Sequence, residues 1–247
     1  MHPVTRALER GVVVELAVDG RATRRLGDLM TLAARKGIAV RIVERAALDA
    51  AAQGGRHQGV VARLSGAVAR DVALEELVAG ASGPALLVVL DGIEDPQNLG
   101  AIARAAEAAG ADGLIRQSRH AAPLGGAAMK ASAGALADLP IATVVNLARA
   151  LESLSALGVW TVGLAAEAPQ SYDSVDLTLP TAIVIGAEGS GLRRLVRERC
   201  EVLAAIPLHG RVESLNASVA AGVVLFEARR QRRASTSRSP SGSGSGR

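Results

Sequence analysis

The sequence predicts an α/β protein that is built around a parallel β-sheet. Short apolar runs alternate with stretches of helical spacing along most of the 247 residues. In the second part of the chain these runs are continuously apolar, which is typical of strands that are covered on both faces. A hydrophobic content of 49% supplies enough apolar surface for a packed core.

Residues 1–64 are predicted to form a small α/β domain. Runs rich in β-branched residues at 12–18, 38–43 and 59–64 predict strands, and the stretches 24–36 and 44–53 predict helices between them. The next segment, 65–84, has weak apolar periodicity and ends in the sequence Gly-Ala-Ser-Gly-Pro, which breaks regular elements. We therefore expect a linker at 65–84.

The second domain is predicted to span 85–233. Six apolar runs predict its strands, at 86–90, 113–115, 141–145, 159–164, 182–185 and 204–207. Helices are expected between them, so the strands should run parallel. The composition after residue 233 is dominated by Ser, Gly and Arg, and we expect 234–247 to be disordered because it cannot bury apolar surface.

Composition also narrows the classes of function. The single cysteine, Cys200, excludes an intramolecular disulfide framework and a cysteine-built zinc site, and we expect no bound metal. No apolar run is long enough to cross a bilayer. The first residues show no positive patch followed by an apolar segment, so a signal peptide is not indicated. These features favour a cytoplasmic protein without membrane contact.

The net charge of +4 is concentrated near the end of the chain. Six arginines and no acidic residue follow Glu227, so the rest of the chain carries about −2, which is 4 − 6. A uniformly basic nucleic-acid-binding domain is therefore not indicated. The basic tail either adds non-specific attraction for phosphates or is an extension without function.

Three loops that follow predicted strands are rich in glycine and polar residues. Loops at the carboxyl ends of parallel strands are where ligands bind in such sheets. The first loop, 91–100, leads into a helix that carries Arg104, and Asn98 stands where an N-cap residue would be. The second and third loops are 186–191 and 206–216.

Simpler interpretations apply to parts of these loops. In the simpler interpretation, Asn98 does no more than cap its helix, and Arg104 is an ordinary solvated side chain. The Gly-x-x-Gly-x-Gly pattern of 186–191 differs from the Gly-x-Gly-x-x-Gly of dinucleotide sites, and a phosphate loop is absent from the sequence. Ser214 has no obvious base partner, so a hydrolytic triad is not indicated. A glycine-rich turn alone leaves Glu188 unexplained.

Together the loops resemble, in order and spacing, the three signature motifs of the SpoU (TrmH) family of tRNA/rRNA ribose 2′-O-methyltransferases in the SPOUT superfamily. The matching residues are 95–104 (DPQNLGAIAR), 185–192 (IGAEGSGL), and 206–208 with 214–218 (IPL and SLNAS). The resemblance implies S-adenosylmethionine as methyl donor and an RNA ribose 2′-hydroxyl as acceptor. It also implies a carboxyl-terminal trefoil knot in the parallel sheet and a homodimer.

The resemblance further implies roles for individual residues. Arg104 matches the catalytic arginine of the family, and we expect it to clamp a phosphate and stabilise alkoxide charge, because a guanidinium is always protonated. We expect Asn98, Glu188, Ser214 and Asn216 to orient Arg104 and the ribose. The residues expected to bind the methyl donor are Leu164, Ala165, Gly186, Ala187, Gly189, Ile206, Leu208, Ser214, Leu215 and Ala217.

Residues 57–62 (HQGVVA) resemble the end of the small L30e-like substrate-binding domain of the RlmB subgroup of this family. That subgroup methylates a guanosine ribose of 23S rRNA, so 23S rRNA is the expected substrate. The chain begins almost inside the pattern of this domain, and we expect its amino-terminal strand to be missing. Three alternatives remain: a tRNA methyltransferase, a thiostrepton-resistance-type rRNA methyltransferase, and a non-catalytic RNA-binding relative.

Overall fold

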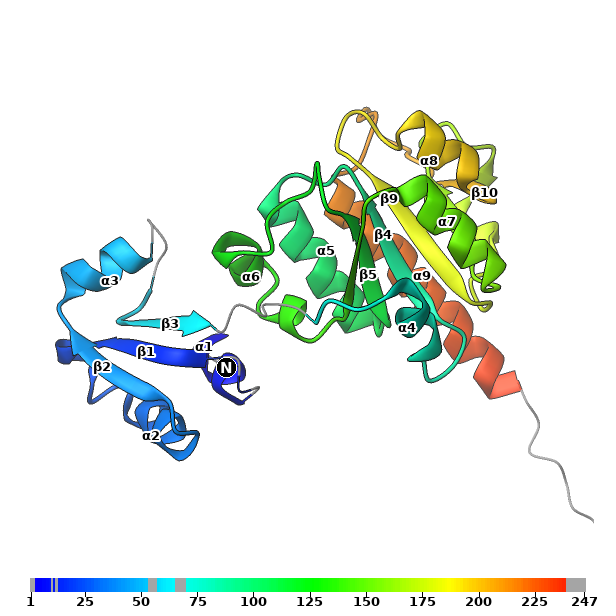
Figure 1. Ribbon diagram of the computed structural model, residues 1–247. Helices are drawn as coiled ribbons and strands as arrows, with labels where there is room; N and C mark the ends of the chain where they lie inside the picture. The colour runs from blue at the N-terminus through cyan, green and yellow to red at the C-terminus, as the bar shows by residue number, and fades with distance from the viewer. Residues whose placement is uncertain (1–2, 10, 12, 53–56, 65–69, 239–247) are drawn as a thin grey trace, which may run out of the picture. The chain divides into compact units, whose positions relative to one another are not determined.

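The computed structural model describes residues 3–9, 11, 13–52, 57–64 and 70–238 (Figure 1). The chain separates into two compact units, Met1–Val68 and Ala69–Arg247. Each unit has its own hydrophobic core, because the buried side chains of the smaller unit form a separate cluster. We describe each unit by itself.

The smaller unit is a three-stranded mixed sheet that is packed against helices. Its elements are α1 (Pro3–Glu9), β1 (Val13–Asp19), the 3-10 helix η1 (Gly20–Ala22), α2 (Gly27–Arg35), β2 (Ala39–Val43), α3 (Arg45–Ala51) and β3 (Val60–Leu64). Strand β1 lies in the middle, parallel to β2 and antiparallel to β3. Leu16 and Val18 of β1 pack with Leu8 of α1 and Leu29 of α2, so these two helices cover one face of the sheet.

The predicted mixed α/β character of the smaller unit is confirmed, with two differences in its helices. Helix α2 begins at Gly27 instead of residue 24, because the chain first forms η1 after β1. The side chain of Asp19 accepts a hydrogen bond from the Arg21 backbone N–H at 3.0 Å and caps this turn. Helix α1 was not predicted, since seven residues give only two turns of apolar periodicity.

The larger unit is a seven-stranded parallel sheet between two layers of helices. Its strands are β4 (Leu86–Asp91), β5 (Gly113–Gln117), β6 (Ile141–Val144), β7 (Trp160–Leu164), β8 (Gln170–Ser171), β9 (Thr181–Gly186) and β10 (Val202–Ala205). Their order is β6-β5-β4-β9-β7-β10-β8, and each pair of neighbours is parallel. The six predicted strands and their parallel direction are therefore confirmed, and the two-residue strand β8 is an addition.

The helices divide between the two faces of this sheet (Figure 1). They are α4 (Leu74–Ala79), α5 (Pro96–Ala109), α6 (Gly126–Ala131), α7 (Leu147–Ala156), α8 (Arg194–Arg199) and α9 (Ala217–Arg238), with short 3-10 turns η2 (Ala135–Ala137) and η3 (Tyr172–Ser174). Leu86 and Val88 point to the face that α5 and α9 cover, whereas Leu87 and Val89 point to α4, α7 and α8. Successive residues of β4 thus belong to different core clusters, as the period of two in a strand requires.

The segment predicted as a linker contains part of the larger unit. Leu77 of α4 is 3% exposed and packs into the core. Its side chain lies so close to Gly113 that any larger residue at position 113 would clash with it. The backbone N–H of Ile141 donates to the Arg70 carbonyl, and that of Val72 donates to the Ile141 carbonyl. The chain before α4 therefore pairs with the edge strand β6. The prediction was wrong for 70–84, because six residues of helix give too little periodicity to recognise.

Helix α9 extends beyond the predicted end of the folded chain. It runs to Arg238, so residues 234–238, for which the composition predicts disorder, are helical. A helix that has already formed gains one backbone hydrogen bond for each residue added, and this favours extension into a polar sequence. Residues 239–247 lie outside the described residues. No described helix, α9 included, is long and apolar enough to cross a membrane.

Arg232 attaches α9 to the opposite end of the larger unit from the strand carboxyl ends. Its guanidinium donates to the backbone carbonyls of Leu177 at 2.9 Å, Ala85 at 3.0 Å and Leu179 at 2.9 Å, and also to that of Pro84. Burial lowers the pKa of Arg232 from its ordinary value, although a guanidinium remains charged at neutral pH. A single planar group therefore satisfies four carbonyls from two chain segments.

We expect Arg232→Ala to lower the free energy of unfolding of the larger unit by roughly 1–3 kcal/mol, because partly buried carbonyls lose their donor. Arg232→Lys should recover only part of this, since an ammonium group cannot reach four acceptors in a planar fork. Urea unfolding followed by the fluorescence of Trp160, the single tryptophan, reports on this unit. The exposed Arg229 is the control, and equal losses for Arg229→Ala and Arg232→Ala would contradict the assignment.

Candidate active site

The loop after β9 is a tight turn that depends on its glycines. A Cβ atom on Gly186 would lie 2.2 Å from the carbonyl carbon of Gly191, so no larger residue fits there. Ala187 and Gly191 exchange backbone hydrogen bonds of 3.1 and 2.9 Å. Gly189 has a φ of 83°, a left-handed conformation that glycine adopts without steric cost. The turn therefore holds Glu188 at its tip.

An ion pair with a buried carboxylate fixes this loop to the neighbouring strand. Asp91, the last residue of β4, is 0% exposed and accepts a hydrogen bond from the Arg193 backbone N–H at 2.8 Å. The Arg193 side chain donates to the same carboxylate through Nε at 2.6 Å, and its Nη2 also donates to Gln117 of β5. One arginine thus connects the carboxyl ends of β4 and β5 to the loop that follows β9.

A pocket of about 430 Å³ opens between the loops that follow β7, β9 and β10. Its volume is within the usual range for small-molecule sites. Apolar side chains and small residues with accessible backbone form most of its wall. All residues expected to bind the methyl donor line it: Leu164, Ala165, Gly186, Ala187, Gly189, Ile206, Leu208, Ser214, Leu215 and Ala217.

The structure adds charged residues to the pocket that the motifs did not single out. Glu167, in the loop after β7, forms an ion pair with Arg197 of α8, and both residues line the pocket. The hydrogen bond from Arg197 lowers the pKa of Glu167 below its ordinary value. Both side chains remain accessible to solvent, so this pair contributes little to stability. Glu213 also lines the pocket.

Three polar side chains from the three loops meet beside the pocket. Asn216 donates through Nδ2 to the side-chain oxygen of Asn98 at 2.9 Å and to Glu188 at 3.1 Å. Asn98 donates to the same Glu188 oxygen at 3.3 Å. We call Asn98, Glu188 and Asn216 the polar cluster. It leaves the second Glu188 oxygen without a partner among the described residues.

The caps of α5 and α9 explain how the polar cluster is held. Asp95 caps α5, because its carboxylate accepts the backbone N–H groups of Gln97 and Asn98, at 3.1 Å each. The expectation that Asn98 is the cap was therefore wrong, and its side chain is available for other contacts. Asn216 caps α9 with its oxygen, which accepts the Ser218 N–H at 2.9 Å. Its amide nitrogen then points to the polar cluster.

The structure does not join all five expected catalytic residues. Arg104 is exposed on α5, and it forms no hydrogen bond or ion pair with any described residue. It follows Asn98 by six residues, which corresponds to roughly 240° around the helix and about 9 Å along it. Ser214 lines the pocket, but its hydroxyl contacts no described polar group. Asn98, Glu188 and Asn216 are thus brought together, and Arg104 stays apart.

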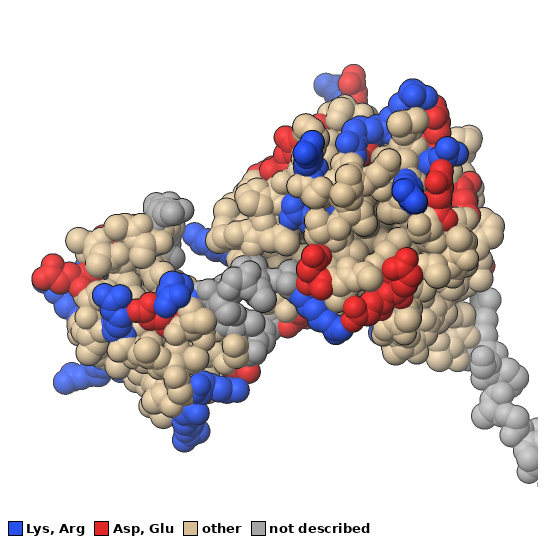
Figure 2. Space-filling view, in the orientation of Figure 1, with Lys and Arg blue, Asp and Glu red and all other residues tan. Residues whose placement is uncertain are grey.

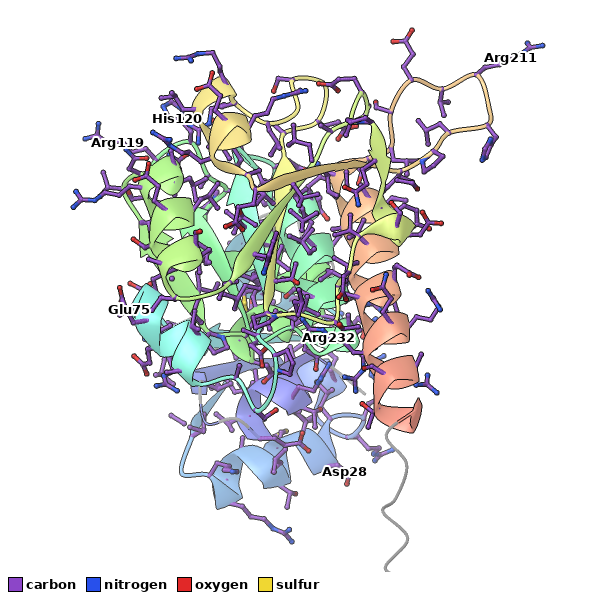
Figure 3. The ribbon with its side chains drawn as sticks, turned by 90° about the vertical axis from the view of Figure 1, so that its right-hand side faces the viewer. Asp28, Glu75, Arg119, His120, Arg211 and Arg232 are labelled. Atoms are coloured by element: carbon purple, nitrogen blue, oxygen red, sulfur yellow. The ribbon has the colours of Figure 1, made fainter. Side chains whose placement is uncertain are left out.

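Further polar residues surround this end of the sheet. Figure 3 shows Arg119, His120 and Arg211 near the loops, and Arg232 toward the other end. His120 adopts a left-handed φ of 52° and lies 3.3 Å from Glu94. Within the described residues, no group of three or more His, Cys, Asp or Glu side chains could hold a metal ion. Burial raises the pKa of the Cys200 thiol to about 12, which keeps it protonated and unreactive.

Family comparisons match both units of the chain. Residues 85–226 match the model of the SpoU rRNA Methylase family, and residues 1–67 match the model of the RNA 2′-O ribose methyltransferase substrate binding domain. The chain is 49% identical over 222 residues to the 23S rRNA (guanosine-2′-O-)-methyltransferase RlmB of Xylella fastidiosa strain 9a5c, covering 89% of each chain. It is 47% identical over 215 residues to RlmB of Pseudomonas putida, covering 87% of this chain and 86% of the relative.

A solved structure resembles the whole chain. The SpoU methyltransferase AviRb from Streptomyces viridochromogenes, in complex with the cofactor AdoMet, aligns with a TM-score of 0.77 and 28% sequence identity. The alignment covers 94% of this chain and 88% of the other. The likeness therefore includes both units and is not limited to the parallel sheet.

We expect Arg193→Ala to lower the free energy of unfolding by about 3 kcal/mol, because it strands the buried Asp91 carboxylate without a counter-charge. The double variant Asp91→Asn/Arg193→Ala should recover more than half of this loss, since the neutral amide removes the buried charge. Trp160 fluorescence during urea unfolding measures both. The neighbouring Arg194 forms an exposed pair with Glu198, and Arg194→Ala should change stability by less than about 0.5 kcal/mol. A loss no larger for Arg193→Ala than for Arg194→Ala would exclude the anchoring role.

Proposed function

Since this chain belongs to the SpoU rRNA methylase family, we propose that it transfers a methyl group to the 2′-hydroxyl of a guanosine in 23S rRNA. It is an S-adenosylmethionine-dependent rRNA 2′-O-ribose methyltransferase of the RlmB type. The observation that carries the proposal is the meeting of three separate loops at one pocket, with the polar cluster at its edge. A binding protein without catalysis would not need this arrangement of polar groups.

The pocket of about 430 Å³ fits S-adenosylmethionine. We propose that Leu164, Ile206 and Leu215 enclose the adenine, because an aromatic base favours an apolar slot. Gly186 and Ala187 line the pocket without a bulky side chain of their own, so their backbone can approach the ligand. Glu188 and Glu213 attract a ligand that carries a positive sulfonium. When bound, S-adenosylmethionine supplies a methyl group that is already electrophilic, so the protein has mainly to position the acceptor.

The polar cluster and Arg104 supply this positioning. In our proposal, Asn98 and Asn216 hold Glu188, whose second oxygen accepts a hydrogen bond from the ribose of the target nucleotide. Ser214 lines the pocket with a free hydroxyl and can contact the same ribose. Arg104 has no ion-pair partner among the described residues, so its guanidinium is available for the adjacent RNA phosphate. That contact would also stabilise negative charge on the attacking oxygen.

The deciding experiment is transfer of a labelled methyl group to 23S rRNA from cells that lack this enzyme, followed by mapping of the modified ribose. We expect one 2′-O-methylguanosine with the wild type. Arg104→Ala should bind S-adenosylmethionine normally in calorimetry and lose at least about 100-fold in transfer rate, which is the scale of losing one preorganised charge contact.

Arg149→Ala is the matched control, because Arg149 is exposed on α7 and its guanidinium contacts no described residue. Its transfer rate should equal that of the wild type. Near-normal transfer by Arg104→Ala would remove Arg104 from the mechanism. Methyl transfer to tRNA instead of 23S rRNA would favour the tRNA alternative, and failure to bind S-adenosylmethionine would favour a non-catalytic relative.

We further propose that the enzyme is a homodimer in which α9 contacts the second copy. One face of α9 exposes Val219 and Phe226, which are 51% and 53% exposed, and Gly222 and Val223 lie between them. The spacing of three, four and seven residues places these four on a single helix face. An exposed apolar stripe that includes the only phenylalanine of the chain is typical of an interface.

Phe226→Asp should convert this dimer into a monomer, because a carboxylate would be buried in an apolar interface. Light scattering at micromolar concentration measures the mass. Leu195 of α8 is 55% exposed and provides the control, so Leu195→Asp should leave the dimer intact. A monomeric wild type, or a Phe226→Asp dimer of unchanged affinity, would contradict the proposed interface.

The strand order supports a knotted chain. Strand β10 lies between β7 and β8, so the connection from β7 to β8 at 165–169 spans it. After β10 the chain runs from between β7 and β8 to α9, which packs beside α5 on one face of the sheet. We propose that the segment after β9 is threaded beneath the 165–169 connection, as in a trefoil knot. An experimental trace of residues 160–238 tests this threading.

A further inference from the structure

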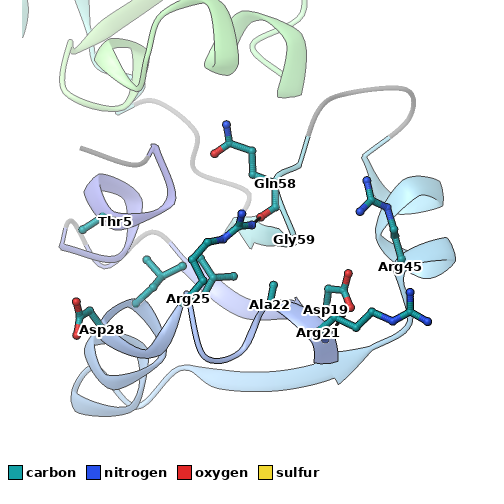
Figure 4. Close-up of a pocket in the computed structure, with 11 residues that line it drawn as sticks. Thr5, Asp19, Arg21, Ala22, Arg25, Asp28, Arg45, Gln58 and Gly59 are labelled. Carbon is teal, nitrogen blue, oxygen red and sulfur yellow. Dashed lines mark hydrogen bonds between the residues drawn. The ribbon is translucent and has the colours of Figure 1, made fainter.

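The smaller unit contains a pocket of about 860 Å³ that is separate from the pocket of the larger unit. Residues of α1, the turn after β1, α2, α3 and the loop before β3 line it, and all of them belong to Met1–Val68. Figure 4 shows the pocket with Arg25 in the middle of the view and with Arg21, Arg45 and Asp19 together on one side. The volume is large enough for a nucleotide.

Three exposed arginines give this pocket a net positive charge. Arg21, Arg25 and Arg45 face two acids, Asp19 and Asp28, which leaves a formal charge of 3 − 2, or +1. The side chains of Arg21 and Arg45 form no hydrogen bond or ion pair with any described residue. Guanidinium groups without partners are the usual contacts to RNA phosphates.

Two other arginines of the smaller unit are less available. Arg41 and Arg63 are both held by Glu15 on the sheet, at 3.1 and 2.9 Å. On the face of the larger unit drawn in Figure 2, basic and acidic residues are interspersed, and no uniformly basic area is seen. RNA binding therefore depends on individual arginines that have no ion-pair partner more than on the electrostatic field of a uniformly basic surface.

The loop before β3 holds an unfavourable backbone conformation beside these arginines. Gln58 has a left-handed φ of 52°, which is uncommon for a residue other than glycine, and its side chain is exposed. Its carbonyl accepts a hydrogen bond from Arg25 Nη2 at 2.6 Å. The next residue, Gly59, donates its N–H to His57 at 3.0 Å. Strain that is fixed by several contacts is typical of functional sites.

A buried carboxylate completes the pocket. Asp19 is 7% exposed, and its Oδ1 accepts the Arg21 backbone N–H at 3.0 Å. The second oxygen has no hydrogen-bond partner among the described residues, although Asp19 lines the pocket. Among the described residues no buried side-chain oxygen lacks a hydrogen-bond partner, so this oxygen is open to the solvent of the pocket and can accept N–H donors of a ligand. The Gln58 amide adds one donor group and one acceptor.

We infer that this pocket holds one unpaired guanine nucleotide of the RNA substrate, at a distance in sequence from the methylated position. Arg21 and Arg45 contact its phosphates, and the Asp19 carboxylate binds the edge of the base. The Gln58 amide, on the other side of Arg25 in Figure 4, contacts the adjoining nucleotide. Guanine presents two adjacent N–H donors, N1 and N2, to such a carboxylate, and unpaired bases are commonly recognised on this edge. The inference rests on the proposed function and assigns a specificity site to the smaller unit.

Gln58→Gly provides the sharpest test, because glycine adopts a φ of 52° without strain and the fold should not suffer. The full-length protein is used with unmethylated 23S rRNA. We expect the variant to keep its thermal midpoint, its S-adenosylmethionine affinity and its kcat, and to raise the KM for rRNA at least tenfold. Wild-type protein should protect one additional unpaired guanine from kethoxal, a reagent for guanine N1 and N2, and Gln58→Gly should weaken this protection.

Two further variants separate the base contact from the phosphate contacts. Asp19→Asn keeps an oxygen to accept the Arg21 N–H but replaces the free acceptor with a donor, so guanine protection should disappear. Arg45→Ala should raise the KM and make it less dependent on salt, since one phosphate contact is lost. Glu15→Gln and Arg41→Ala are the controls, because both residues lie outside the pocket, and their KM values should stay within twofold of wild type.

The outcomes distinguish this inference from the proposed function. Unchanged KM and kethoxal protection in Gln58→Gly and Asp19→Asn, with methyl transfer intact, would overturn the pocket alone. Binding of free GMP that Asp19→Asn abolishes, without any change in the KM for rRNA, would also overturn it. Absence of methyl transfer to rRNA by the wild type would count against the proposed function instead.

Discussion

The ion pair between the buried Asp91 and the partly exposed Arg193 is the contact on which the geometry of the candidate active site depends. Asp91 ends a strand from the first motif, and Arg193 follows the glycine-rich turn of the second. Because the carboxylate has no access to solvent, it requires a partner at this place, and among the described residues the loop after β9 provides it. The turn, and Glu188 at its tip, are therefore held against β4 and the start of α5.

The pocket and the polar cluster, which this ion pair holds in place, differ in chemical character. The pocket between the loops that follow β7, β9 and β10 is bounded mainly by apolar and small residues, which suits an uncharged adenine. The polar cluster at its edge consists of two amides and one carboxylate, which suit hydroxyl groups of a ribose. Methyl transfer from a sulfonium needs orientation more than covalent help, so the protein has mainly to position the donor and the acceptor.

Much of the fold was predictable because its signals are local. Continuous apolar runs predicted the strands of the larger sheet, since only strands buried on both faces need them. Helices α1 and α4 were missed, because one or two turns carry too little periodicity. The end of α9 was placed too early, because composition describes whether a segment can fold alone, and residues 234–238 extend a helix that already exists.

The sequence by itself determined which residue types stand in the three loops and in what order, and glycine spacing indicated a tight turn around Glu188. Only the tertiary structure decided which of them touch. Asn98 bonds to Glu188 and to Asn216 across 90 and 118 residues, because β9 inserts beside β4 although four strands separate them along the chain. Arg104, in contrast, lies exposed on α5. Parallel neighbours are chosen by packing of both sheet faces, and such long-range packing is not encoded in any local pattern.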